Sequence, residues 1–106
     1  MDTTIDVVAG DYGYTINFTL QNADSTAFDL TGATLAMKVQ KQGTTYALSE
    51  SMTVVTAASG TCKYLPSSAA FPEEGIYNLQ IVCTFSGAVV TFTNIKAVAS
   101  AKVPTN

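Results

Sequence analysis

The sequence contains no histidine, no arginine and no tryptophan, and these absences narrow its chemistry. Without histidine, the Ser–His and Cys–His pairs that activate most protein nucleophiles cannot form. A Ser–Lys pair is allowed by composition, but these residues fall mostly on predicted strand faces and turns, where nothing would activate the lysine. Without arginine, the chain lacks the bidentate group that clamps carboxylates and phosphates. We therefore predict that the protein is not an enzyme and has no catalytic residues.

Charge is also scarce, because charged residues make up 12% of the chain, against about 25% in an ordinary soluble domain. Thr, Ser, Asn and Gln take their place, which is typical either of a threonine-rich β-protein or of a surface that is buried against other subunits. No stripe of basic residues would neutralise phosphates, so we expect no nucleic-acid partner. The basic residues are five scattered lysines, Lys38, Lys41, Lys63, Lys96 and Lys102.

The chain also lacks long apolar runs. The first residues, MDTTIDVVAGD, are acidic and lack the apolar segment of a secretory signal. No run approaches the ~20 residues of a membrane-spanning helix, so we expect no membrane partner and synthesis in the cytoplasm without a signal peptide. The 106 residues, 47% of them apolar, suffice for one core. We expect a single domain over residues 1–106, with its core at about 3–103 and a short C-terminal tail.

What the sequence does contain is a two-residue alternation of apolar and polar side chains, which only a half-buried strand requires. The clearest examples are 13–21 and 34–41. Inward-facing residues are expected at Tyr14, Ile16, Phe18, Leu20, Leu35, Met37 and Val39, and in a third strand at Tyr77, Leu79, Ile81, Cys83 and Phe85. The further predicted strands are 3–8, 45–49, 52–57, 61–65, 76–85, 88–95 and a last segment at about 98–103. This pattern predicts an all-β fold.

Residues 73–77, EEGIY, resemble the tyrosine corner of immunoglobulin-like domains, in which a tyrosine near the start of a late strand bonds back to the preceding backbone. The position two after Tyr77 is Leu79 rather than cysteine, so an antibody-type Cys–Trp–Cys core is excluded. We predict an immunoglobulin-like antiparallel β-sandwich of seven to eight strands. Phe28 and Leu30 are expected to close one end of its core.

The two cysteines, Cys62 and Cys83, lie on predicted strands joined by a single connection. An antiparallel ladder would let them face each other, and a disulfide there would be worth about 3 kcal/mol in the chain-entropy model. The alternative, which we favour, is two free thiols used as small apolar residues. Without histidine, two cysteines make no ordinary zinc site, and we expect no metal and no cofactor.

The carboxylates form no cluster that would supply the six to eight oxygens of a calcium site. Glu73 and Glu74 are adjacent in a loop, and Asp11, Asp24 and Asp29 lie at turns, so we expect solvated turn residues.

Three aromatic residues fall outside the core pattern and are candidates for a sugar platform: Tyr12, Tyr46 and Phe71. Phe71 lies in SSAAFPEEG, where its ring either projects as a docking knob or folds back over the sandwich end; we expect the second. Asn17-Phe18-Thr19 matches a glycosylation sequon, which we interpret as an ordinary outward-facing pair on a strand.

Residues 10–43, GDYGYTINFTLQNADSTAFDLTGATLAMKVQKQG, resemble the opening of the immunoglobulin-like domain at the N-terminus of phage baseplate upper proteins and related virion components. The shared pattern is a Gly or Asp turn, an alternating strand, an Asp-containing turn and then "DLTGA", here residues 29–33, before a second strand. Residues 60–64 and 75–79 are similar to that family's G-x-x-x-Y and G-x-Y strand openings. The resemblance spans most of residues 10–95 and brings no catalytic residues.

The resemblance implies a non-enzymatic structural component of a bacteriophage virion, such as a baseplate, neck, tail or capsid decoration module. Its partners would be other virion proteins, with a homo-oligomer or symmetric array expected. The expected contact elements are the strand at 3–8, the loop at 66–74 and the tail at 96–106, because unpaired edges invite strand addition. Deleting 96–106 is predicted to leave a folded monomer that no longer enters particles. The alternative is a carbohydrate- or cell-surface-binding module that takes a host glycan.

Overall fold

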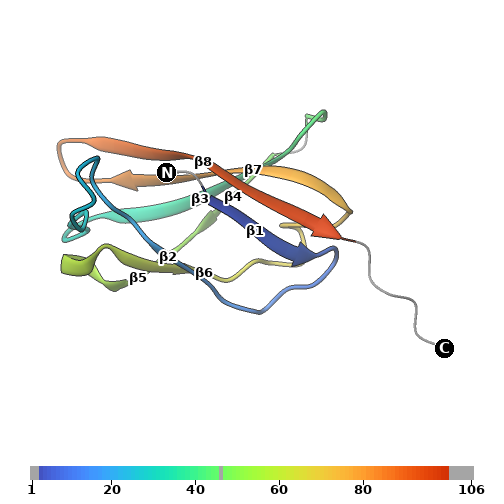
Figure 1. Ribbon diagram of the computed structural model, residues 1–106, viewed down its shortest axis with the longest axis horizontal. Helices are drawn as coiled ribbons and strands as arrows, with labels where there is room; N and C mark the ends of the chain where they lie inside the picture. The colour runs from blue at the N-terminus through green and yellow to red at the C-terminus, as the bar shows by residue number, and fades with distance from the viewer. Residues whose placement is uncertain (1–2, 46, 101–106) are drawn as a thin grey trace.

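The structure, a computed structural model, describes residues 3–45 and 47–100 and places two β-sheets face to face (Figure 1). The strands are β1 (Thr3–Val8), β2 (Ile16–Thr19), β3 (Thr34–Lys41), β4 (Ala47–Ser51), β5 (Thr53–Thr56), β6 (Thr61–Tyr64), β7 (Gly75–Thr84) and β8 (Val89–Ser100), and a 3-10 turn, η1, covers Ala57–Ser59. The five-stranded sheet has the order β1-β8-β7-β3-β4, and the three-stranded sheet has the order β2-β6-β5. The predicted all-β sandwich is confirmed.

The strand order is that of an immunoglobulin-like domain. Strands β8-β7-β3-β4 correspond to the G, F, C and C′ strands of that fold, and β2-β6-β5 correspond to B, E and D. One pair departs from the predicted antiparallel arrangement, because β1 runs parallel to β8. These are the first and last strands, so a long connection separates them and no hairpin forces them to be antiparallel.

The strand β2 is shorter than the predicted 13–21 because the chain crosses from one sheet to the other just before it. Along this crossing, the Gly10 N–H donates to the Phe71 carbonyl at 2.8 Å, and the Gly13 N–H donates to the Pro66 carbonyl at 3.1 Å. After β2, the Leu20 N–H donates to the Gly60 carbonyl at 2.8 Å, outside the strand ladder. Backbone bonds to loops thus replace sheet pairing at both ends of the alternating stretch.

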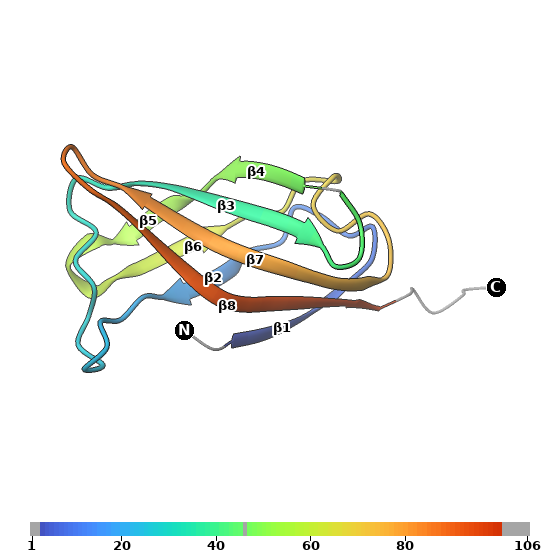
Figure 2. The ribbon, with the colours of Figure 1, turned by 90° about the horizontal axis from the view of Figure 1, so that it is seen from above.

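A second crossing joins β4 and β5, which correspond to the predicted strands at 45–49 and 52–57. The strand β4 pairs with β3, whereas β5 pairs with β6 in the other sheet. The chain changes sheets at Met52, whose N–H donates to the Leu35 carbonyl at 3.0 Å. The two crossings lie on opposite sides of the sandwich (Figure 2), so the sheets are linked along both of their long edges.

The last strand differs from the prediction of two pieces, 88–95 and about 98–103, because Val89–Ser100 is one strand. Asn94 has a φ of 63°, and the register to β7 shifts between Leu79 and Ile81, which together mark a β-bulge. Because of the extra residue, Phe92 and Ile95 both turn toward the core although they are three positions apart. The bulge explains the broken alternation; residues 101–103 of the prediction lie outside the described residues.

The core lies between the two sheets and agrees with the predicted inward faces. Phe18, Leu20, Leu35, Met37, Val39, Tyr77, Leu79, Ile81 and Cys83 are buried, whereas Tyr14, Ile16 and Phe85 are partly buried against them. The predicted end plug is also present, since Leu30 is buried and the Phe28 ring meets the Phe92 ring edge-on at a centroid distance of 5.1 Å. The tyrosine corner is present as well, because the Tyr77 hydroxyl bonds to the Glu73 carbonyl.

Candidate functional site

The first predicted contact element, residues 3–8, forms β1 at one edge of the five-stranded sheet. Among the described strands, β1 pairs with β8 alone. Its other edge therefore has no strand partner within the described part of the chain. Asp6 lies on the exposed face of this strand, and Val8 at its end is 38% exposed. An edge of this kind is where a neighbouring chain adds a strand.

The second predicted contact element, the loop at 66–74, is largely part of the core. Pro66, Ala70 and Phe71 are buried, and the Phe71 ring meets the Tyr77 ring edge-on at a centroid distance of 5.1 Å. The expectation that Phe71 folds back over the sandwich end is confirmed, and a docking knob at this residue is excluded. The exposed carboxylate at Glu73 lies 3.6 Å from the Lys41 ammonium.

The third predicted contact element, the tail at 96–106, is a strand rather than a tail over its first five residues. Residues 96–100 belong to β8, where they pair with β1 on one side and with β7 on the other. Ala97 and Ala99 are buried in the core. The backbone of 96–100 therefore holds the sheet together, while the outward side chain of Lys96 stays exposed. We expect that deleting 96–106 disrupts the sheet, in contrast to the folded monomer expected from the sequence. Residues 101–106 lie outside the described residues.

The structure describes two of the three aromatic residues that are candidates for a sugar platform. Tyr12 is 64% exposed on the connection between β1 and β2, and Phe71 is buried. Tyr46 lies outside the described residues. Leu65, 49% exposed, is close to Tyr12 in the fold because the Gly13 N–H bonds to the Pro66 carbonyl. This gives one small apolar spot rather than a row of rings.

The cysteines are free and buried, in agreement with the favoured interpretation. The ladder that would let them face each other is absent, because Cys62 lies on β6 in one sheet and Cys83 on β7 in the other. Burial raises the pKa of the Cys62 thiol to about 11, with a smaller contribution from Cys83. Burial also raises the pKa of Cys83. Both thiols are therefore poor nucleophiles at neutral pH.

Two aspartates cap the connection between β2 and β3, which we call the acidic turn (residues 22–31). Asp24 accepts hydrogen bonds from the Thr26 hydroxyl at 2.6 Å and from the Thr26 N–H at 3.1 Å. Asp29 accepts the same two bonds from Thr31, at 2.6 and 2.9 Å. In each case the hydroxyl bond, followed by the backbone bond, lowers the pKa of the carboxyl below its ordinary value. Both carboxylates are therefore ionised and held in place at neutral pH.

The tip of the acidic turn is ordered by further hydrogen bonds of its own. The Asn22 amide donates to the Thr26 hydroxyl at 3.0 Å and to the Ala27 carbonyl at 3.1 Å. Ser25 adopts a left-handed conformation with a φ of 68°, which is uncommon for a residue other than glycine. The turn projects from one end of the sandwich (Figure 2) and is rigid although its tip is exposed.

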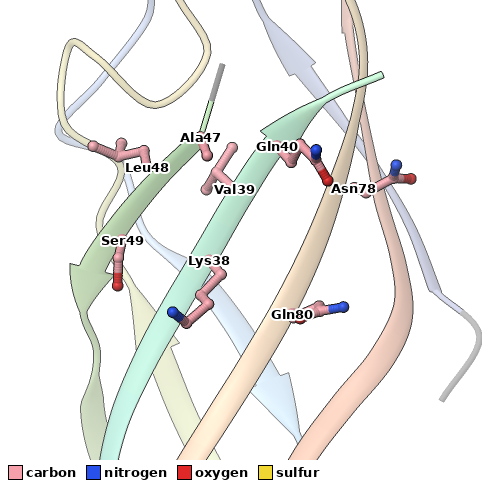
Figure 3. A pocket seen from close by; sticks show the side chains of 8 residues that line it. All are labelled: Lys38, Val39, Gln40, Ala47, Leu48, Ser49, Asn78 and Gln80. Carbon is pink, nitrogen blue, oxygen red and sulfur yellow. The ribbon is translucent and has the colours of Figure 1, made fainter. Parts of the chain in front are cut away.

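The outer face of the five-stranded sheet carries a shallow hollow of about 390 Å³ over β3, β4 and β7 (Figure 3). A second hollow of about 240 Å³ continues it across β8. Gln40, Asn78 and Gln80 line both, so the two form one depression. It is open above β4 because Ala47 and Ser49 are short where they oppose Gln40 and Lys38. We call its amide and lysine side chains the amide face: Lys38, Gln40, Asn78, Gln80, Asn94 and Lys96.

Cross-strand pairing brings the members of the amide face together. Lys38 lies opposite Gln80, and Gln40 lies opposite Asn78, in the ladder between β3 and β7. Asn78 in turn lies opposite Lys96 on β8. The Gln42 amide donates to the Asn78 side-chain carbonyl at 3.1 Å, which orients Asn78 and leaves its own N–H groups as donors. The face is therefore rich in N–H donors and contains no carboxylate.

The β-bulge adds the last member of the amide face. Asn94 is the left-handed residue of the bulge, and it lines the second hollow beside Gln80 and Lys96. Bulges re-aim side chains and recur next to functional sites, and a non-glycine residue with positive φ is a strained conformation that such sites often hold. The β-bulge of β8, the longest strand, therefore lies at the hollow.

The amide face was not predicted from the sequence. The sequence does contain an indication of it. The outward positions of 34–41 and 76–85 carry amides and a lysine, whereas threonine would suit a strand that only faces solvent. The pairing of residues about 40 positions apart, which gathers them, is visible only in the fold. Elsewhere in the described ranges, no three His, Cys, Asp or Glu side chains gather as they would around a metal ion.

The structure defines the class of this protein as an immunoglobulin-like β-sandwich domain. Beyond that class, the sequence matches no model of a protein family and no curated protein. The described residues contain no helix long and apolar enough to cross a membrane.

Proposed function

We propose that this domain is a non-enzymatic structural component of a bacteriophage virion and that it acts by docking onto other virion proteins. The motif resemblance of residues 10–43 supports the virion part of the proposal. The amide face supports the docking part and is the observation that carries it. The hollowed part of this sheet face spans β4, β3, β7 and β8, and its lining is rich in donors and contains no carboxylate. Such a face suits a protein partner better than it suits a reaction, since no nucleophile or acid–base pair converges there.

The contact elements that the structure favours differ in part from those the sequence suggested. The β1 edge is retained, because it is an unpaired strand edge among the described strands. The amide face, which includes Lys96, is added. The buried residues of the other two segments are withdrawn because their side chains lie in the core: Pro66, Ala70, Phe71, Ala97 and Ala99. Docking through a strand edge supplies backbone hydrogen bonds, and docking through the face supplies side-chain specificity.

Sedimentation of a lysate of the native source, with mass spectrometry of the fractions, tests the proposal. The chain of 11.1 kDa is expected to travel with megadalton particles in a fixed ratio to the other particle proteins. That ratio would also indicate the symmetry of the site it occupies. A chain that is found only in the slow fractions, as a monomer or small oligomer, would contradict a structural role.

A second candidate function is a carbohydrate- or cell-surface-binding module. One observation favours it, namely that the amides of Gln40, Asn78 and Gln80 lie in a hollow of a size that holds a small ligand. The test is glycan binding by the domain and by a triple alanine variant at these positions. Asn17→Ala, an exposed change on β2 in the other sheet, is the control. Loss of binding in the triple variant alone would favour the glycan over the virion partner.

A further inference from the structure

We propose that the amide face receives the acidic turn of a second copy of this chain, so that copies join head to tail. This inference rests on the proposed docking function and names its partner. A second copy is the expected partner because the chain itself carries both halves of a complementary contact. One half is a rigid projecting turn with two fixed carboxylates, and the other is a hollow lined by amide and ammonium donors.

Charge is divided between these two parts of the molecule. Lys38 and Lys96 lie on the outer face of the five-stranded sheet, and neither forms an ion pair with a described residue, whereas Lys41 is paired with Glu73. Asp24 and Asp29 lie on the acidic turn with their side chains exposed. Each surface thus holds two like charges that a neighbouring copy would neutralise.

The acidic turn cannot reach the amide face of its own chain. The turn leads into β3 at its first residue, Thr34, and the hollow begins near the other end of that strand, at Lys38 to Gln40. The stretch of strand from Thr34 to Lys38, the nearer edge of the hollow on β3, spans roughly 13 Å. The turn projects at the end of the sandwich where β3 begins (Figure 2), whereas the hollow lies on the outer face of the sheet, over the middle of β7 and β8. Contact between the two surfaces therefore requires two molecules.

The turn, and Asn78 at the centre of the face, are preorganised for such a contact. Bonds from Thr26 and Thr31 already fix the carboxylates, and the bond from Gln42 already fixes Asn78. Little side-chain entropy would be lost on docking, which favours association. The contact joins two different patches, so it is heterologous and builds rings or open filaments rather than closed pairs. This agrees with a repeated component of a larger assembly.

Sedimentation velocity over a concentration series tests the inference with two pairs of matched variants. K38E/K96E reverses the charges of the face, and K63E, on the three-stranded sheet, is its control. D24N/D29N removes the charges of the turn while the Asn side-chain carbonyls still accept the bonds from Thr26 and Thr31. E73Q/E74Q, in the exposed loop before β7, removes two negative charges outside both surfaces and is the control for this variant. Each test variant is expected to lower the self-association constant by roughly tenfold, and the controls to leave it unchanged.

Mixing the two defective variants gives the sharper result. K38E/K96E retains an intact turn, and D24N/D29N retains an intact face, so a head-to-tail contact predicts a one-to-one heterodimer that grows no further. A mixture that stays monomeric overturns the inference, as does a wild-type chain that is monomeric at about 1 mM. Should K38E/K96E instead abolish retention on an acidic polysaccharide or entry into particles, with self-association unchanged, the face has another occupant and self-docking is wrong.

The lysate experiment separates this inference from the proposed function. A chain that travels with particles but does not associate with itself retains the virion role and loses the head-to-tail contact. A chain that associates with itself but never travels with particles retains the contact and loses the virion role.

Discussion

The Tyr77 hydroxyl donates a hydrogen bond of 2.8 Å to the backbone carbonyl of Glu73, four residues upstream, and receives a bond of 3.3 Å from the Glu73 N–H. The Tyr77 ring itself is fully buried and packs against Phe71. One side chain therefore fixes both the loop that covers the end of the core and the start of β7.

Tyr77→Phe is expected to lower the free energy of unfolding by about 1–2 kcal/mol, because the carbonyl loses its bond while the ring packing stays. Urea unfolding at neutral pH measures the change. Tyr12→Phe is the matched control, since this ring is 64% exposed, and it is expected to change the stability by less than about 0.5 kcal/mol. Equal effects of the two substitutions would mean that the corner bond adds no stability.

Gly60→Ala is expected to cost on the order of 3 kcal/mol or to prevent folding. Gly60 has a φ of 70°, and an added Cβ would lie 2.4 Å from the Leu20 carbonyl oxygen and 2.8 Å from that of Phe28. Gly87→Ala is the control, because nothing lies within 4 Å of its added Cβ. Thermal unfolding of the two variants compares them, and an unchanged melting temperature for Gly60→Ala would show that the backbone around β2 can move apart.

Acid is expected to destabilise the acidic turn through Asp29. The hydroxyl and backbone bonds from Thr31 lower the pKa of this carboxyl in the folded state. Its contribution is therefore present above the ordinary aspartate pKa of about 4 and is lost as the pH falls through the lower folded value. Asp29→Asn keeps the acceptor and does not titrate, so its stability should fall less steeply in this range. An NMR titration of the Asp29 carboxyl checks the direction of the shift, and a pKa above about 4 would contradict it.

Alkali is expected to act on the core through Cys62, whose pKa is raised to about 11 by burial. A raised folded pKa gives stability that is complete below the ordinary thiol pKa of about 8.5 and is lost as the pH rises toward the folded value. Cys62→Ala should show a weaker loss of stability over this range.

In the native state at mildly alkaline pH, a thiol-specific disulfide reagent should modify Cys62 and Cys83 only as fast as the domain opens. An added surface thiol, Ser86→Cys, should react at once.

Truncation tests how much of the last strand the fold requires. A chain that ends after Ser100 is expected to stay folded, because all the pairing of β8 with β1 and β7 is kept. A chain that ends after Ile95 loses Ala97 and Ala99 from the core and most of the partner of β1, and is expected to be unfolded. Circular dichroism and the dispersion of amide NMR signals distinguish the two. A folded shorter chain would show that residues 96–106 are dispensable for the fold after all.

The strands that the sequence predicted best are those whose alternation is regular over their whole length. The strands at 3–8 and 34–41 were predicted to the residue, because period-two alternation is a local property of a half-buried strand. The predicted strand at 88–95 ends five residues before the observed one, because the bulge at Asn94 shifts the phase of the alternation. The sheet crossing at Met52 was missed, since both flanking segments alternate and nothing local marks the change of partner.

The amide face was missed for a different reason. Lys38 and Gln80, or Gln40 and Asn78, meet only through the ladder between β3 and β7, and strand pairing is a long-range property. The turn positions of Asp24 and Asp29, in contrast, could be predicted from the sequence, because the bonds that hold these turns span two positions in the chain. The parts of the candidate site that depend on local hydrogen bonds could be predicted, whereas the part that depends on register could not.

The position of β8 between β1 and β7 also sets when the domain can fold. The N-terminal strand has its only described strand partner in residues 95–100, so β1 leaves the ribosome long before that partner is made. The five-stranded sheet can close only after residue 100 has emerged from the exit tunnel. Until then β7 lacks its neighbour on that side of the sheet. We expect folding of the sheet to be slow and to wait for this last strand, because the pairing of β1 with β8 joins residues far apart in the chain.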